Sequence, residues 1–119
     1  MSLKVYVYDK CSTCRKAIQF LDGAGIAYQK IAIREQPPTN AELKTMLKAQ
    51  TGELKKLFNT SGMDYRSLNI KDKLPTLSIP DAINLLASNG NLIKRPFAIS
   101  KNVALVGFKE DTWQAELLG

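Results

Sequence analysis

The feature that most constrains the fold is a change of periodicity near the start of the chain. Residues 3–8 (LKVYVY) are rich in β-branched and aromatic residues, which predicts a strand. From Ser12 onward, apolar residues at positions 14, 17, 18 and 21 have the spacing of an amphipathic helix, and glycines at 23 and 25 end it. Residues 27–33 return to a strand pattern. A strand, a helix and a strand in this order favour a parallel pair joined by a right-handed crossover.

The middle of the chain has helical patterns, and the last quarter returns to strands. We expect helical segments at four places, namely after the capping box at 39–42, at 53–58, at 64–68, and between Ser78 and Asn89-Gly90. Strands are expected at 96–99 and 103–106 around a turn at 100–102, and a closing helix at 110–118.

These patterns predict one α/β domain over residues 1–119. The length suits a single domain, and the composition, with 45% hydrophobic and 24% charged residues, is that of an ordinary globular protein. We expect a β-α-β unit at 1–34, a helical insertion at 37–93 and a β-β-α unit at 95–119. The two ends must meet in one mixed sheet, so the helical block is an insertion within the domain.

Composition excludes several classes of protein. No apolar run approaches the roughly 20 residues that span a bilayer, and no signal peptide opens the chain, so we expect a cytoplasmic protein that does not engage a membrane. Histidine is absent, which excludes His-dependent acid–base catalysis and mixed Cys/His zinc sites, and we expect no metal. The net charge of +6 is spread out, without the basic block and interleaved aromatics that would indicate direct nucleic-acid binding.

The chemistry is expected from two cysteines at the first strand-to-helix junction. Cys11 would lie at the start of the helix, where unpaired N–H groups and nearby cations such as Lys10 and Arg15 stabilise a thiolate. We therefore predict that Cys11 is the nucleophile and that Cys14, on the apolar stripe, resolves the mixed disulfide. Half of a metal site and a pair of unreactive thiols are the alternatives, but a Cys-x-x-Cys in the first turn of a β-α-β unit is typical of thioredoxin-like proteins.

A proline directly before the third strand supports the same interpretation. Thioredoxin-like folds place a cis proline there, beside the nucleophilic cysteine, where it leaves backbone groups free to pair with a substrate. An ordinary trans proline at the start of an edge strand is the alternative. Together with the cysteine pair, the Arg95-Pro96 sequence favours the cis form.

Three segments in order resemble the arsenate reductase (ArsC)/Spx/MgsR family of thioredoxin-like proteins. They are residues 11–17 (CSTCRKA), residues 92–96 (LIKRP) and residues 106–108 (VGF). The resemblance runs through nearly the whole chain. It implies a glutaredoxin-like mixed sheet with an inserted helical block, and a redox-active centre in an oxidoreductase.

The resemblance implies two functions. The first is a thiol-dependent reductase with Cys11, Cys14 and Arg95 as catalytic residues and glutathione, glutaredoxin or a thioredoxin-type dithiol protein as electron donor. We expect the binding surface of the site to comprise Lys10, Ser12, Thr13, Arg15 and Pro96. Glutaredoxin-coupled arsenate reductases of the family place three arginines around the oxyanion, and only Arg95 matches them. Asn59 and Gly107 occupy the other two positions, so we expect arsenate reduction to be weak or absent.

The second function is that of a redox-switch transcriptional regulator. Spx and MgsR carry the same Cys-x-x-Cys and bind the RNA polymerase α subunit, whose contact would fall near Gly52 of this chain. A glycine before a helix is more simply explained as a helix break. The chain also stops soon after its last predicted helix, where Spx continues into a longer tail. The sequence leaves enzyme and regulator open.

Overall fold

The structure is a computed structural model that describes residues 3–118. Its elements follow the predicted order of a β-α-β unit, a helical block and a β-β-α unit. The first and last units comprise β1 (Lys4–Val7), α1 (Ser12–Gly23), β2 (Gln29–Ala32), β3 (Phe97–Ile99), β4 (Ala104–Val106) and α6 (Glu110–Leu118). The helical block comprises α2 (Asn40–Ala49), η1 (Leu54–Leu57), α3 (Met63–Ser67), α4 (Ile70–Lys73), η2 (Leu74–Thr76), α5 (Ile79–Ser88) and η3 (Gly90–Leu92).

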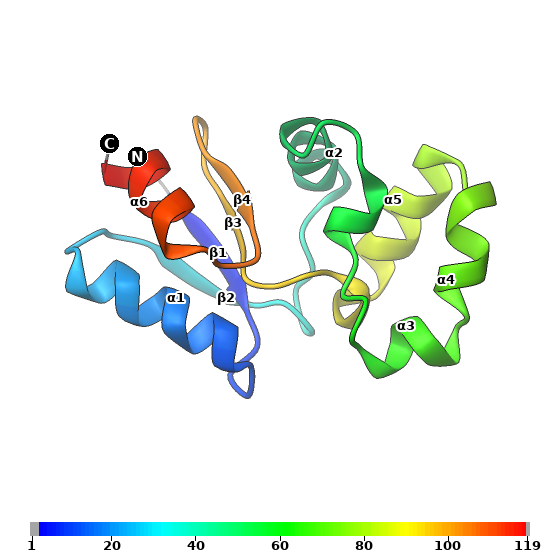
Figure 1. The fold of residues 1–119 in the computed structure, drawn as a ribbon, viewed down its shortest axis with the longest axis horizontal. Coiled ribbons are helices and arrows are strands. Elements are labelled where there is room, and N and C mark those ends of the chain that lie inside the picture. Colours follow the sequence, from blue (N-terminus) through cyan, green and yellow to red (C-terminus); the bar gives the residue numbers. More distant parts are fainter. Residues whose placement is uncertain (1–2, 119) are drawn as a thin grey trace.

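The strands form one mixed sheet in the order β2-β1-β3-β4 (Figure 1). β1 pairs with β2 in parallel and with β3 antiparallel, so that Tyr6 lies opposite both Ile31 and Phe97. β4 pairs antiparallel with β3 and forms an edge of the sheet. The prediction of an α/β fold with a thioredoxin-like mixed sheet is confirmed.

The sheet separates two apolar cores because side chains alternate across a strand. Val5 and Val7 point to the side covered by α1 and α6, where Trp113 is buried. Tyr6 points to the other side and packs with the residues of the helical block, among them Phe58. In Figure 1 the sheet lies between α1 and α6 on one side and the helical block on the other.

Local sequence explains where the longer helices begin. Thr39 caps α2 in a capping box, since its hydroxyl accepts from the Glu42 N–H and the Glu42 carboxylate accepts from the Thr39 N–H. Ser78 caps α5 through the Asp81 N–H, with Pro80 in the first turn. Gly25, at φ +69°, follows the end of α1 in the left-handed region that favours glycine.

The shorter elements differ from the prediction. The segment expected at 53–58 is a single 3-10 turn, and α4, η2 and η3 were not expected. These pieces have three or four residues, too few for apolar periodicity to appear, and their geometry comes from packing against the core. None of the helices within residues 3–118 is both long and apolar enough to cross a membrane.

Candidate active site

The site begins at the N-terminus of α1, where Cys11 is the N-cap residue. Its backbone is extended (φ −92°, ψ 116°), and its Sγ accepts a hydrogen bond of 3.3 Å from the Cys14 N–H. The Cys11 N–H donates to the Tyr8 carbonyl at 3.0 Å, which closes the turn between β1 and α1. The Cys11 sulfur therefore has the position that a Ser or Asp oxygen takes at an ordinary helix start.

The two cysteines differ in exposure. Cys14 is buried at 1% exposure on the apolar stripe of α1, with Ala17 and Leu21, and packs against the sheet. Cys11 is half-buried, and both residues are free thiols. A molecule in solution therefore meets Cys11 first.

Their pKa values are shifted in opposite directions. Partial burial acts to raise the pKa of the Cys11 thiol, but hydrogen bonds from the Cys14 thiol and N–H, together with the Arg95 guanidinium, outweigh it and lower the pKa below its ordinary value. Burial raises the pKa of the Cys14 thiol to about 12, and the neighbouring Cys11 adds to this shift. Of the two thiols, Cys11 is therefore the one that loses its proton first as the pH rises.

Arg95 reaches the site from the connection between η3 and β3. The Arg95–Pro96 peptide bond is cis, as predicted. The Arg95 guanidinium lies over the ring of Tyr8, with Cζ 4.9 Å from the ring centroid, and the Arg34 guanidinium lies at the same distance from that ring. Two cation–π contacts thus meet on Tyr8 and hold Arg95 beside Cys11.

Cys11 faces a cavity of about 640 Å³ between the sheet and the helical block. No acidic residue is found among the described residues that line it, and the lining includes four cations: Lys56, Lys94, Arg95 and Lys109. Lys56 is paired with Glu53 at 2.7 Å. The cavity is therefore a positively charged space in front of the thiolate, suited to anionic ligands.

Asn59 and Gly107, the two positions where the resemblance implied arginine in arsenate reductases, both line this cavity. Lys94 crosses over Gly107, since a Cβ built on that glycine would lie 2.9 Å from the Lys94 Cε. Gly107 has φ +73°, a conformation that also favours glycine. The missing arginine at 107 thus makes room for a lysine from the neighbouring segment.

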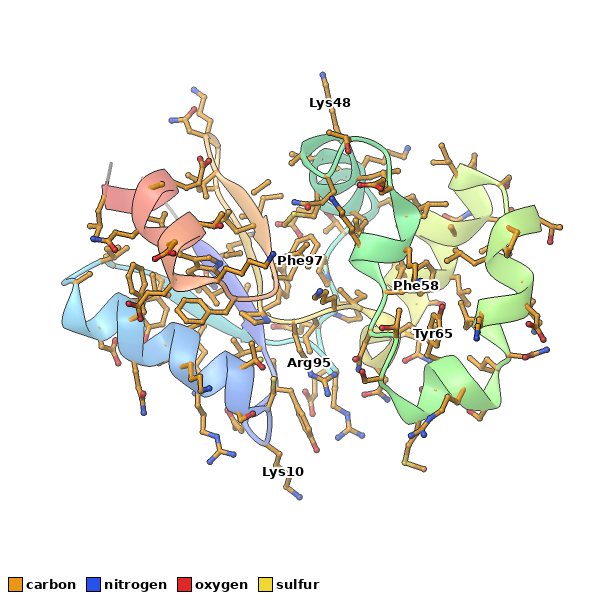
Figure 2. All side chains as sticks on the ribbon, in the orientation of Figure 1. Lys10, Lys48, Phe58, Tyr65, Arg95 and Phe97 are labelled. Carbon is orange, nitrogen blue, oxygen red and sulfur yellow. The ribbon has the colours of Figure 1, made fainter. Side chains whose placement is uncertain are left out.

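The predicted binding residues separate into two groups. Thr13 lines the cavity together with Cys11 and Arg95. Lys10, Ser12 and Arg15 are exposed and are absent from its lining, and Pro96 is buried. Figure 2 shows Lys10 extending away from the protein, whereas Arg95 lies between the sheet and the helical block.

Sequence reasoning missed Tyr8, Arg34, Lys94 and Lys109 as parts of the site. Each comes from a segment whose own pattern explains it as a strand end or a solvated charge. One signal was available: Lys94 directly precedes Arg95, and Gly107 has no side chain to occupy the space in front of it. Within residues 3–118, no cluster of three or more Cys, Asp or Glu side chains could hold a metal ion.

A thioredoxin-like α/β fold with a Cys-x-x-Cys at the first helix start defines a class of thiol–disulfide proteins. The model of the ArsC family matches residues 6–116, and the chain belongs to this family. It is 49% identical over 114 residues to the protein YusI of Bacillus subtilis (strain 168), a match that covers 96% of this chain and 97% of YusI.

Regulators are also among the relatives. The global transcriptional regulator Spx of Enterococcus faecalis is 30% identical over 110 residues, covering 92% of this chain and 81% of Spx. The regulatory protein MgsR of Bacillus subtilis is 24% identical, covering 89% of this chain and 82% of MgsR.

Solved structures agree with the family. A Bacteroides fragilis protein described as related to the ArsC family superposes with a TM-score of 0.90 at 40% identity, covering 97% of each chain. A possible arsenate reductase from Streptococcus mutans superposes with a TM-score of 0.84 at 45% identity, covering 90% of this chain and 91% of that one.

Proposed function

We propose that the protein is a thiol-dependent disulfide reductase that cycles Cys11 and Cys14 between dithiol and disulfide. The observation that carries the proposal is the placement of the two thiols: the half-buried Cys11 caps α1 and accepts the Cys14 N–H, whereas Cys14 is buried, which lowers the pKa of Cys11 and raises that of Cys14. A nucleophile must be a thiolate that substrates can reach, and a resolving thiol must stay protonated until it is needed. The cytoplasm is reducing, so it would keep this cysteine pair in the dithiol form that can reduce a substrate.

The reaction balances in two steps. The Cys11 thiolate attacks one sulfur of the substrate disulfide, the substrate S–S bond breaks, and the first substrate thiolate leaves. Cys14 then attacks the Cys11 sulfur and its proton passes to a released substrate thiolate, which frees the second substrate thiolate and leaves a Cys11–Cys14 disulfide. Two electrons have passed to the substrate. Glutathione, glutaredoxin or a thioredoxin-type dithiol protein would return the pair to the dithiol state.

Arg95 would serve the first step by stabilising the attacking thiolate. Arsenate is a poor substrate in this proposal. A compact oxyanion is best bound by several arginine guanidinium groups that each donate two hydrogen bonds. Asn59 and Gly107 stand where two of these arginines would be needed. Lys94 supplies a single positive charge near Gly107, but its ammonium cannot donate the paired hydrogen bonds of a guanidinium.

A redox-switch regulator is the second candidate, favoured by the similarity to Spx and MgsR. That resemblance implies binding to the RNA polymerase α subunit, gated by the same cysteine pair. Gly52, near the implied contact, is exposed after the end of α2 and has φ +79°. The geometry explains this glycine as a turn residue, so the support for a regulator rests on the relatives.

One set of proteins tests both candidates. The wild type should reduce a small neutral disulfide with glutathione or thioredoxin as donor, and Cys11→Ser should not. Cys14→Ser should trap a mixed disulfide detectable by mass spectrometry. Arsenate turnover with glutathione and glutaredoxin should be at least tenfold below disulfide turnover. An active Cys11→Ser protein would contradict the reductase, and redox-dependent binding of the polymerase α subunit without turnover would establish the regulator.

A further inference from the structure

The cavity in front of Cys11 continues into a second hollow along β4. The second hollow measures about 550 Å³ and shares Gln50, Leu105 and Thr112 with the first. Together they form a groove, called here the β4 groove, that runs from Cys11 along β4 to the β3–β4 turn. α2 contributes Lys48 to its lining and α6 contributes Thr112. In Figure 1 the β3–β4 hairpin projects between α6 and α2.

The edge of β4 presents unpaired backbone groups to this groove. Ser100 pairs with Val103 and Pro96 with Gly107 through hydrogen bonds of 2.8 Å. Because hydrogen-bonded and non-hydrogen-bonded pairs alternate in an antiparallel ladder, the N–H and C=O groups of Ala104 and Val106 point away from β3. No hydrogen bond from the described residues reaches them. Such an edge can accept one more strand.

The charge of the residues that line the β4 groove indicates which kind of polypeptide would bind there. Lys94 and Lys109 lie at the Cys11 end of the β4 groove, and Lys48 and Lys101 lie at the far end. Glu116 is the one acidic residue among the described residues that line it. The Ser100 hydroxyl at the far end is buried and has no hydrogen-bond partner among the described residues.

We propose that the β4 groove binds an extended acidic polypeptide segment as an added strand on β4 and delivers its disulfide to Cys11. This rests on the proposed reductase function and names its substrate class. The distance from Val103 to Gly107 corresponds to about five extended residues at roughly 3.4 Å each. A small anionic disulfide would occupy the Cys11 end and leave Lys48 and Lys101 without a role. A chain of five residues reaches all four lysines.

The chemistry on the peptide is the first step given above. The Cys11 thiolate bonds to the sulfur of the peptide cysteine, the peptide S–S bond breaks, and the leaving thiolate takes the electron pair. With a peptide activated as its 2-pyridyl disulfide, the leaving group is 2-thiopyridone, which absorbs light and reports the rate. The Cys14→Ser protein is used because it stops at the mixed disulfide.

The test compares three peptides of six residues with a terminal cysteine: one rich in Glu, one with Gln at every Glu position, and the Glu peptide N-methylated at alternate residues. The neutral reagent 2,2′-dithiodipyridine is the reference. At low salt the Glu peptide should react about tenfold faster than the Gln peptide, relative to the reference, because the lysines attract it. N-methylation should remove most of this advantage, and high salt should reduce it.

Charge reversal locates the effect on the protein. Lys48→Glu, at the far end of the β4 groove from Cys11, should lower the Glu-to-Gln rate ratio severalfold. Lys71→Glu is the matched control, since Lys71 is exposed on α4 and is absent from the groove lining. Equal rates for all peptides with a fast reference reaction would overturn the groove and leave the reductase intact. A slow reference reaction would overturn the reductase itself. An equal advantage for the pyridyl disulfide of glutathione would show a small-anion pocket and overturn the added strand.

Discussion

Two sulfur atoms three residues apart have different chemistry because their surroundings differ. Cys11 ends a turn and caps a helix, so it receives an N–H hydrogen bond and faces Arg95. Cys14 is one turn further, on the side of α1 that the sheet covers. The N–H hydrogen bond at the helix start reaches only Cys11, and burial weighs more heavily on Cys14, so hydrogen bonding and burial account for most of the contrast, with a smaller contribution from Arg95.

The contrast predicts the effect of removing Arg95. Arg95→Met keeps much of the side-chain volume and removes the charge, so the pKa of Cys11 should rise and its alkylation by iodoacetamide at pH 7 should slow by on the order of threefold to tenfold. The measurement is the alkylation rate against pH in the Cys14→Ser background. The midpoint for Cys11 should move to higher pH, because losing the cation weakens the thiolate. Arg66→Met, on the exposed side of α3, is the control, and an unchanged midpoint in Arg95→Met would remove Arg95 from the site.

Among the elements, α2 packs its apolar residues in the core on the sheet and is also hydrogen-bonded to β1 through the Glu42 carboxylate. Glu42 completes the capping box of α2 and also accepts from the Tyr6 hydroxyl at 2.7 Å and the Lys4 ammonium at 3.2 Å. Burial acts to raise the pKa of Glu42, but the hydrogen bonds from Thr39, Tyr6 and Lys4 outweigh it and lower the pKa. The carboxylate form is therefore stabilised by folding.

Glu42→Gln should lower the free energy of unfolding by about 1–2 kcal/mol at pH 7, because a charged acceptor of three hydrogen bonds is replaced by a neutral one. A lowered pKa in the folded state gives stability that is present above the ordinary pKa and is lost as the pH falls. The gap between wild type and Glu42→Gln should thus shrink as the pH falls below about 4.5. Urea unfolding at pH 7 and at pH 4 and below measures this. Glu35→Gln, at an exposed position, is the control, and a gap that does not depend on pH would contradict the assignment.

Elements with their own start signals were predictable from sequence. The capping box at Thr39, the Ser78 cap and the strand pattern before Cys11 each place an element within a few residues. The segment 63–76 was less predictable, since it breaks into three short helices set by burial of Tyr65 and Ile70 in the core.

The centre of the site was predictable because its residues are near one another in sequence or follow a family pattern. Cys11, Cys14 and Arg95 are of this kind. The passage of Lys94 over Gly107 and the two cations on Tyr8 are contacts between distant segments. Apart from the missing side chain at Gly107, a single sequence gives no signal for such contacts, since each residue alone fits an exposed or strand-end position.

On the scale of the whole molecule, backbone hydrogen bonds tie the end of the helical block to its middle, and one close backbone contact joins the block to the segment after β2. Asn59 N–H donates to the Leu92 carbonyl at 2.7 Å and Lys94 N–H donates to the Leu57 carbonyl at 2.8 Å. Gly90, at the start of η3, packs directly on the backbone beyond β2: a Cβ built there would lie 1.9 Å from the Ile33 carbonyl oxygen. These contacts bring Asn59, Lys94 and Arg95 to the cavity that faces Cys11.

Gly90→Ala should therefore destabilise the whole protein. The added methyl meets backbone atoms, which cannot rotate away as a side chain can, so the cost should be about 3 kcal/mol, at the upper end for overpacking. For a chain of this size that lowers the Tm by on the order of 10 °C. Trp113 fluorescence, which reports on the core on the far side of the sheet, should fall at the same temperature as far-UV circular dichroism, because the helical block and the sheet unfold as one unit.

The control is Gly23→Ala, where no heavy atom lies within 4 Å of the added Cβ, and it should change the free energy of unfolding by less than about 1 kcal/mol. Separate transitions for the two probes would show that the helical block is a unit of its own.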